Sequence, residues 1–301
     1  MKKITRYIAT ILLGAGLLAG CSGSSGSPQS SITGKVADGY LVNALVFLDK
    51  NSNYQLDVGE PSTATDSTGS FTLNIDPADV GKYPIVALAI KDQTTDLDNL
   101  SVKLGNTYVL SMRALAITPP TSGMVTGTAS NFISPISTLI RETLVANPLM
   151  TLADASVQVR NQLNLPPEIN IHHDYVFGSM SGAHKPDYQK VHQVAQQMAG
   201  LMGEQAGTVM NGNRPVTVMN GIPEKYRAMI GNMGSYLPQI TEVITDHGAA
   251  GGNMTSMGIR DLIHSVMGPP VNAPPLFNNY TSRRSFWNMS GLRMMARSPH
   301  H

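Results

Sequence analysis

The chain has 301 residues, enough for two ordinary domains of about 150 residues each. Charged residues make up 14% of the chain and hydrophobic residues 42%, which argues against an intrinsically disordered protein because such chains need high charge and few apolar groups. The formal net charge is +1, so no overall basic field indicates nucleic-acid binding. The single cysteine excludes an intrachain disulfide framework and every site that needs a pair of cysteines.

The N-terminus has the pattern of an export signal. Three basic residues, Lys2, Lys3 and Arg6, precede an apolar run from residue 8 to residue 18. The run is shorter than the stretch of about 20 apolar residues that spans a bilayer. We therefore expect a signal peptide over residues 1–20 rather than a membrane helix.

The apolar run closes on Leu18-Ala19-Gly20-Cys21, which resembles the lipobox of bacterial lipoproteins at each of its positions. The resemblance implies cleavage before Cys21, attachment of a diacylglyceryl group to its thiol, and acylation of the new N-terminus. Several acyl chains, at about 0.8 kcal/mol per buried methylene, make a permanent anchor. The alternative is that Cys21 is an ordinary small residue near a signal-peptidase site.

The residues after the cysteine bear on location. In lipoproteins of Gram-negative bacteria an aspartate after the cysteine commonly marks retention in the inner membrane, so Ser22 favours the outer membrane. Residues 21–31 are rich in serine and glycine and predict a flexible tether.

From residue 32 the sequence changes to short β-prone runs separated by turn residues. Strands are predicted at residues 32–36, 44–48, 70–73, 85–90 and 108–110, with turn signals at Asp38-Gly39 and Thr68-Gly69. Because no helical period lies between these runs, they predict an antiparallel β-sandwich over residues 32–117.

The order of strand, acidic loop and strand resembles a known type of bacterial module. Residues 34–49, Glu60-Pro61 and residues 65–71 are similar to the carboxypeptidase-regulatory-like and B-type surface-adhesin sandwiches of secreted bacterial proteins. The resemblance covers about residues 32–90 and implies a β-sandwich there.

The loop between the second and third predicted strands has oxygen-bearing side chains at regular spacing. Places 1, 3, 5, 7, 9 and 12 of a twelve-residue loop are Asp49, Asn51, Asn53, Gln55, Asp57 and Glu60. Calcium takes six to eight hard oxygen ligands, and this spacing supplies them, with place 7 contributing its backbone carbonyl. Tyr54 departs from the pattern at place 6, where an EF-hand has glycine. The alternative is a solvated loop whose Asn and Asp side chains cap their own backbone.

Beyond residue 128 the apolar spacing becomes helical. Helices are expected to begin at Ser134-Pro135, at Thr151, near Pro186 and at Pro223, with a fifth around residues 259–266. Their apolar faces predict a compact α-helical bundle over residues 128–268. Residues 131–140 and 188–196 resemble helical domains that follow such β modules in bacterial surface lipoproteins, and this resemblance carries over no catalytic residue.

The many methionines and histidines raise the question of a metal site. Thioethers suit copper(I), but Met198 and Met202, like Met229 and Met233, have the spacing of core positions on a helix. A zinc site needs three or four converging ligands, and no HExxH motif fixes such a geometry. The sequence therefore favours packing methionines and surface histidines.

No complete enzyme signature is found. The segment Gly178–Gly182 has Met180 where a nucleophile elbow has serine, and neither a P-loop nor a dinucleotide fingerprint is present.

The terminal residues 269–301 predict a proline-rich linker and a basic tail, in which arginines beside Trp287 suit lipid headgroups or an anionic polymer. Packing of Trp287 on the helices is the alternative.

These observations predict a membrane-anchored, non-enzymatic lipoprotein of the bacterial cell envelope, acting in surface binding or assembly. The expected cofactor is calcium, and the expected partners are the membrane, through lipid on Cys21, and a protein or surface polymer, but not nucleic acid. A periplasmic hydrolase or metal-handling protein is one alternative, using His172, His173, His184 and His192. A structural subunit that associates with copies of itself is another.

Overall fold

The computed structural model describes residues 30–100, 102–113, 131–209 and 223–249. The predicted signal peptide, Cys21, most of the tether, the predicted fifth helix and the basic tail lie outside these residues.

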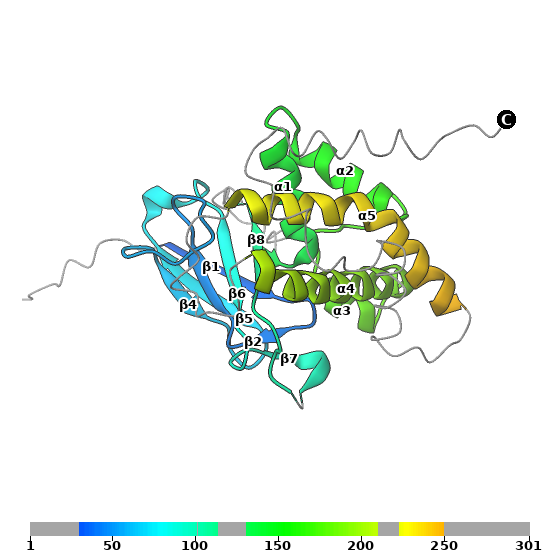
Figure 1. The fold of residues 1–301 in the computed structure, drawn as a ribbon, viewed down its shortest axis with the longest axis horizontal. Coiled ribbons are helices and arrows are strands. Elements are labelled where there is room, and N and C mark those ends of the chain that lie inside the picture. The colour runs from blue at the N-terminus through cyan, green and yellow to red at the C-terminus, as the bar shows by residue number, and fades with distance from the viewer. Residues whose placement is uncertain (1–29, 101, 114–130, 210–222, 250–301) are drawn as a thin grey trace, which may run out of the picture.

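Strands occupy the first part of the chain and helices the second, as the sequence predicts (Figure 1). The strands are β1 (Ser30–Val36), β2 (Leu41–Val42), β3 (Leu45–Leu48), β4 (Ser62–Ala64), β5 (Ser70–Ile75), β6 (Ile85–Ala89), β7 (Thr95–Asp96), β8 (Tyr108–Met112) and β9 (Asn131–Ile133). Short 3-10 helices are η1 (Pro77–Asp79) and η2 (Leu97–Asn99). The α-helices are α1 (Pro135–Ala146), α2 (Leu152–Gln162), α3 (Tyr175–Met180), α4 (Lys185–Val209) and α5 (Pro223–Ala249).

The strands form a four-stranded sheet in the order β4-β3-β6-β8, a three-stranded sheet in the order β5-β1-β9, and the pair β2-β7. Among the described strands, neighbours pair antiparallel, as predicted, except β1 and β9. The alternation of buried Phe71, Leu73 and Ile75 with outward-facing neighbours gives β5 the period of a strand with one covered face.

The strand β9 lies in the stretch that the sequence assigns to the helical region. It pairs in parallel with β1 over Gly34↔Asn131 to Val36↔Ile133. The backbone N–H of Ala37 also donates to the Ile133 carbonyl, at 2.9 Å. The chain therefore enters α1 directly from the sheet, and the first helix starts from a fixed position.

The helix starts at Ser134 and Thr151 are confirmed. The Ser134 hydroxyl accepts a hydrogen bond from the Ser137 N–H at 3.2 Å, and Pro135 occupies the first turn. Thr151 and Asp154 form a reciprocal capping box at the start of α2. The short helix α3, which the sequence does not predict, begins where the Asp174 carboxylate accepts the N–H of Phe177 at 2.9 Å.

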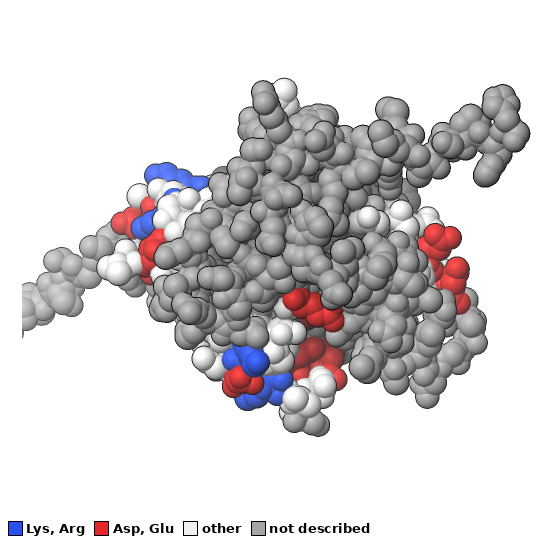
Figure 2. All heavy atoms as spheres, viewed as in Figure 1, with Lys and Arg blue, Asp and Glu red and all other residues white. Residues whose placement is uncertain are grey.

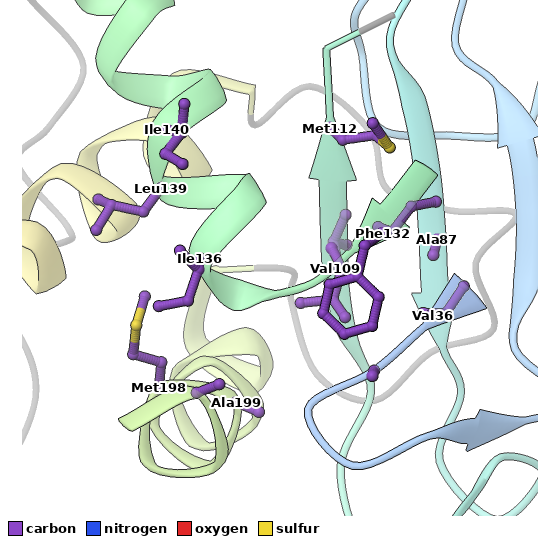
Figure 3. Close-up of a cluster of buried hydrophobic side chains, with 14 of the residues drawn as sticks. Val36, Ala87, Val109, Met112, Phe132, Ile136, Leu139, Ile140, Met198 and Ala199 are labelled. Carbon is purple, nitrogen blue, oxygen red and sulfur yellow. The ribbon is translucent and has the colours of Figure 1, made fainter. Parts of the chain in front are cut away.

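A continuous hydrophobic core joins the sheets to the helices. Every residue of β6 and β8 is buried, so both faces of these strands are covered. Helices α1 and α4 contact β8, while β5 of the other sheet contacts β3 and β4. Figure 3 shows Ile136 and Leu139 of α1 and Met198 of α4 on the helix side of this core, with Val109 and Phe132 on the strand side.

The four methionines at predicted core positions, Met198, Met202, Met229 and Met233, are all buried, as expected of packing residues.

None of the described helices is long and apolar enough to cross a membrane. On the face shown in Figure 2, described acidic and basic side chains lie close together in small groups on the strand side of the molecule.

Candidate functional site

The predicted calcium loop is the connection between two paired strands. Asp49 follows β3 directly, and the loop ends at Glu60 before β4 begins at Ser62. The pairs Leu45↔Ala64 and Phe47↔Ser62 hold the two strands together. The sheet therefore fixes both ends of the loop, which favours one loop conformation.

The Asp49 carboxylate is fully buried at the base of the loop. Its Oδ1 accepts the backbone N–H of Asn53 and its Oδ2 that of Tyr54, both at 3.0 Å. Burial raises the pKa of Asp49, while these N–H groups and the charge of Arg141 act in the opposite direction. Within the described residues, no lysine, arginine or histidine forms a salt bridge with this carboxylate.

The middle of the loop is held by its own side chains. The side-chain oxygen Oδ1 of Asn51 accepts a hydrogen bond from the backbone N–H of Asn53 at 3.2 Å. Oδ1 of Asn53 accepts one from the backbone N–H of Gln55 at 2.8 Å. The amide groups of Asn51 and Asn53 both donate to Oδ2 of Asp57, at 2.7 and 2.8 Å. The alternating places of the loop thus converge on Asp57.

Glu60 closes the loop onto its beginning. Its Oε1 accepts the backbone N–H of Lys50 and its Oε2 that of Asp57, at 2.6 and 3.0 Å. Burial raises the pKa of Glu60, and the two N–H groups lower it. The structure therefore links Asp49, Asn51, Asn53, Asp57 and Glu60 in one hydrogen-bonded loop, which Gln55 joins through its backbone. In this state the polar groups cap their own backbone, as the alternative interpretation of the sequence expects.

The described residues, 30–100, 102–113, 131–209 and 223–249, contain no group of three His, Cys, Asp or Glu side chains placed to hold a metal ion. The loop has only three side chains of these types, Asp49, Asp57 and Glu60. Its other predicted ligands are amide and backbone oxygens, which calcium also accepts.

Tyr54 has the backbone conformation that place 6 requires. Its φ is +64°, in the left-handed region where glycine is usual, and Ser52 is similar at +59°. The side chain explains why a tyrosine occupies this position. It is buried, its hydroxyl donates to Oε1 of Glu142 at 2.7 Å, and its ring centre lies 4.6 Å from that of Tyr226.

A cluster of charged residues on α1 and α5 surrounds the Tyr54 ring, in which Arg141 and Glu142 are buried and Arg227 is partly exposed. Glu142 pairs with Arg141, whose Nη1 lies 2.8 Å from Oε1, and with Arg227, whose Nε lies 3.6 Å from Oε2. Burial raises the pKa of Glu142, and Arg141 and the Tyr54 hydroxyl lower it. Arg227 also donates to the Ser52 carbonyl at 3.4 Å, so the cluster contacts the loop at a second place.

Sequence reasoning missed this cluster. Arg141 and Glu142 are the charged residues of an otherwise uncharged helix, and that adjacent pair is the signal that marks them. Their partner Tyr54 lies 88 residues from Glu142, so spacing along the chain does not connect them.

His172 contacts a serine, but the geometry is not that of an activated nucleophile. Its Nε2 lies 2.7 Å from the Ser156 hydroxyl, which itself donates to the Leu152 carbonyl at 2.6 Å. The Leu152 carbonyl can only accept, so it competes with His172 Nε2 for the single serine proton. Burial and the charge of Arg160 lower the pKa of His172.

The other histidines of the alternative site have separate partners. The ring centre of His173 lies 5.8 Å from that of Tyr188, with the two rings tilted. Nδ1 of His184 lies 3.6 Å from Oδ2 of Asp187, and Nε2 of His192 lies 2.7 Å from Oδ2 of Asp98. The contacts of these four histidines therefore converge on no shared ligand position in the part of the chain that the structure describes.

Comparison with protein-family models, with curated proteins and with solved structures gave no match for this chain. The loop from Asp49 to Glu60 is the candidate site on its residues and geometry alone.

Proposed function

We propose that the protein is a lipid-anchored, non-enzymatic component of the bacterial cell envelope whose loop 49–60 binds calcium. In this proposal calcium stiffens a β-sandwich that, with a helical bundle, acts in surface binding or assembly. Burial of β6 and β8 on both faces supports a sandwich covered by helices. The observation that carries the calcium assignment is Asp49, a fully buried carboxylate at place 1 that lacks a salt bridge within the described residues.

The residues of the loop fit calcium in donor type. Asp49, Asp57 and Glu60 supply carboxylates, Asn51 and Asn53 supply amides, and Gln55 would supply its backbone carbonyl. A turn of an asparagine amide by 180° exchanges its nitrogen for its oxygen. Since the amide nitrogens of Asn51 and Asn53 both face Asp57, such a turn would place their oxygens beside that carboxylate and would break the hydrogen bonds that these oxygens accept from the N–H groups of Asn53 and Gln55.

The left-handed conformation of Tyr54 supports the same assignment. A calcium loop needs a sharp turn at place 6, and a side chain there is unfavourable unless its surroundings hold it. The Glu142 and Tyr226 contacts of Tyr54 supply that support. The departure from glycine is therefore compatible with the turn.

Thermal melting of the full chain carrying Cys21→Ser tests calcium binding. For a dissociation constant of about 10⁻⁴ M, 10 mM calcium should stabilise the folded state by about 2.7 kcal/mol, and the melting temperature should rise by several degrees. Magnesium at the same concentration is the ionic control. An unchanged melting temperature would reject the calcium site.

Two substitutions assign the effect to the loop. Asp49→Asn and Glu60→Gln should each remove most of the calcium-dependent rise. Asp92→Asn, at an exposed carboxylate outside the loop, should leave the rise intact. A rise that survives both loop substitutions would place the binding site elsewhere.

The lipid anchor is tested separately by cell fractionation. The full chain with Cys21 should be found with the membranes, and Cys21→Ser should move it to the soluble fraction. A Cys21→Ser protein that stays with the membranes would contradict lipidation at this residue.

A further inference from the structure

Tyr54 belongs to the loop through its backbone and to the helices through its side chain. Its N–H donates to Oδ2 of Asp49 at 3.0 Å, while its hydroxyl donates to Oε1 of Glu142 at 2.7 Å. The left-handed turn at place 6 sets the direction of the ring. A change in the loop backbone at this place therefore displaces the ring from its position against the helices.

The loop has a second connection to the same helices. The Ser52 carbonyl, at the other left-handed residue of the loop, accepts a hydrogen bond from Nη2 of Arg227 on α5 at 3.4 Å. The Arg227 guanidinium also lies 5.8 Å from the centre of the Tyr54 ring. Both turns of the loop thus contact α5.

On the helix side, Glu142 depends on the hydrogen bond from the Tyr54 hydroxyl. Glu142 is buried, and its Oε2 accepts no hydrogen bond within the described residues, although Nε of Arg227 lies 3.6 Å from it. The Tyr54 hydroxyl and the Arg141 guanidinium share its other oxygen. Displacing Tyr54 leaves a buried carboxylate with fewer donors, which is unfavourable in a low-dielectric interior.

We propose that Tyr54 couples loop 49–60 to helices α1 and α5, so that calcium in the loop holds α5 against the strands. The inference rests on the calcium site proposed above. Calcium favours the loop conformation in which Tyr54 reaches Glu142, and by linkage it favours the docked helices. The chemistry of the loop thereby regulates the packing of a helix that contributes none of its calcium ligands.

Amide hydrogen exchange of the full chain carrying Cys21→Ser tests the coupling. Calcium should slow exchange in the loop and also, by about tenfold, in α5 from Tyr226 to Ile244. Calcium affinity is measured in parallel by titration calorimetry. Binding without any change of exchange in α5 would overturn the coupling and leave the calcium site standing.

Two variants separate the side chain of Tyr54 from its turn. Tyr54→Gly keeps the left-handed turn and removes the contact with Glu142, and Tyr54→Phe removes only the hydroxyl. Each should bind calcium and protect the loop, while the calcium effect on α5 falls below about threefold. Tyr83→Phe is the matched control and should retain the full effect. An undiminished effect on α5 in folded Tyr54→Phe and Tyr54→Gly would overturn the coupling.

Absence of calcium binding would reject the proposed site, and the coupling is then judged in calcium-free protein. Asp49→Asn weakens the acceptor of the Tyr54 N–H, so exchange in α5 should become faster than in the unsubstituted chain. Unchanged exchange in α5 of Asp49→Asn would overturn the coupling without reference to calcium.

Discussion

Strands and helices meet at two junctions that differ in chemistry. At the β1 junction, residues 34–40 contact β9 and α3 through parallel backbone pairing and through the Tyr175 hydroxyl, which donates to the Ala37 carbonyl at 3.0 Å. At the Tyr54 junction, loop 49–60 contacts α1 and α5 through the buried Arg141 and Glu142 and the partly exposed Arg227.

The difference separates a structural contact from an adjustable one. Backbone hydrogen bonds in a sheet respond little to ions, whereas a buried carboxylate responds to every nearby charge and donor. We therefore expect the β1 junction to determine whether the fold forms, and the Tyr54 junction to determine how tightly α5 packs.

The largest expected effect is at the β1 junction, with Gly34→Ala. A Cβ at this position would overlap the Asn131 carbonyl oxygen, a backbone atom that cannot shift without disturbing the pairing of β1 with β9. We expect the free energy of unfolding to fall by about 3 kcal/mol, measured by chemical denaturation.

Gly105→Ala is the matched control, since a Cβ there meets no atom within 4 Å. Equal effects of the two substitutions would show that the parallel pairing contributes little, and the contrast between the junctions would fail.

The two junctions also differ in what the sequence reveals. The proposed ligands of loop 49–60 follow a local spacing, and the helix starts at Ser134 and Thr151 follow local capping rules, so a short window of sequence is enough to predict them. The strand β9 has only three residues, too few to show a period of two, and the six-residue helix α3 is likewise too short.

The partner of Tyr54 is hidden for another reason. Compared with an EF-hand, Tyr54 is an unfavourable replacement for glycine. The hydrogen bond between the Tyr54 hydroxyl and Glu142 forms only in the folded chain. The sequence thus predicts the proposed ligands of the loop but not the contact that explains its unusual residue.

A smaller effect is expected on the pH dependence of the free energy of unfolding, through the ionisation of Asp96 beside the β1 junction. Asp96 lies beside Gly39 and the buried Asp38, and burial raises the pKa of Asp96 to about 6. The backbone N–H of Asp98 and the charge of His192 lower this pKa, whereas the charge of Asp98 raises it. A carboxyl whose pKa is higher in the folded than in the unfolded chain destabilises the fold when ionised. This cost is complete above pH 6 and disappears as the pH falls towards the unfolded value of about 4.

Asp96→Asn should therefore increase the free energy of unfolding by about 1–2 kcal/mol at pH 8 and have little effect at pH 4. Denaturation at the two pH values measures this difference. The exposed Asp92, whose left-handed backbone also suits asparagine, supplies the control Asp92→Asn. If Asp96→Asn increases the free energy of unfolding equally at both pH values, ionisation of Asp96 is not the cause of the increase.

The smallest expected effect comes from a partly exposed contact beside the β1 junction, where Asp98 lies next to Gly39. Nε2 of His192 lies 2.7 Å from Oδ2 of Asp98, and this contact lowers the pKa of Asp98. The contribution of this contact to the free energy of unfolding is therefore present above the ordinary pKa of an aspartate. It is lost as the pH falls through the lowered pKa of Asp98. Because Gln196 donates to the same oxygen at 2.7 Å, His192→Gln leaves the carboxylate with a donor.

We expect His192→Gln to cost about 0.5 kcal/mol at pH 6 in low salt, and less in 1 M NaCl, because partly exposed ion pairs are weak and screened. His184→Gln is the control, since its contact with Asp187 is longer, at 3.6 Å, and more exposed. A loss in His192→Gln as large as that in Gly34→Ala would mean that ionic contacts, rather than backbone pairing, hold the β1 junction. The two junctions would then respond to the same solution conditions, and the contrast between them would fail.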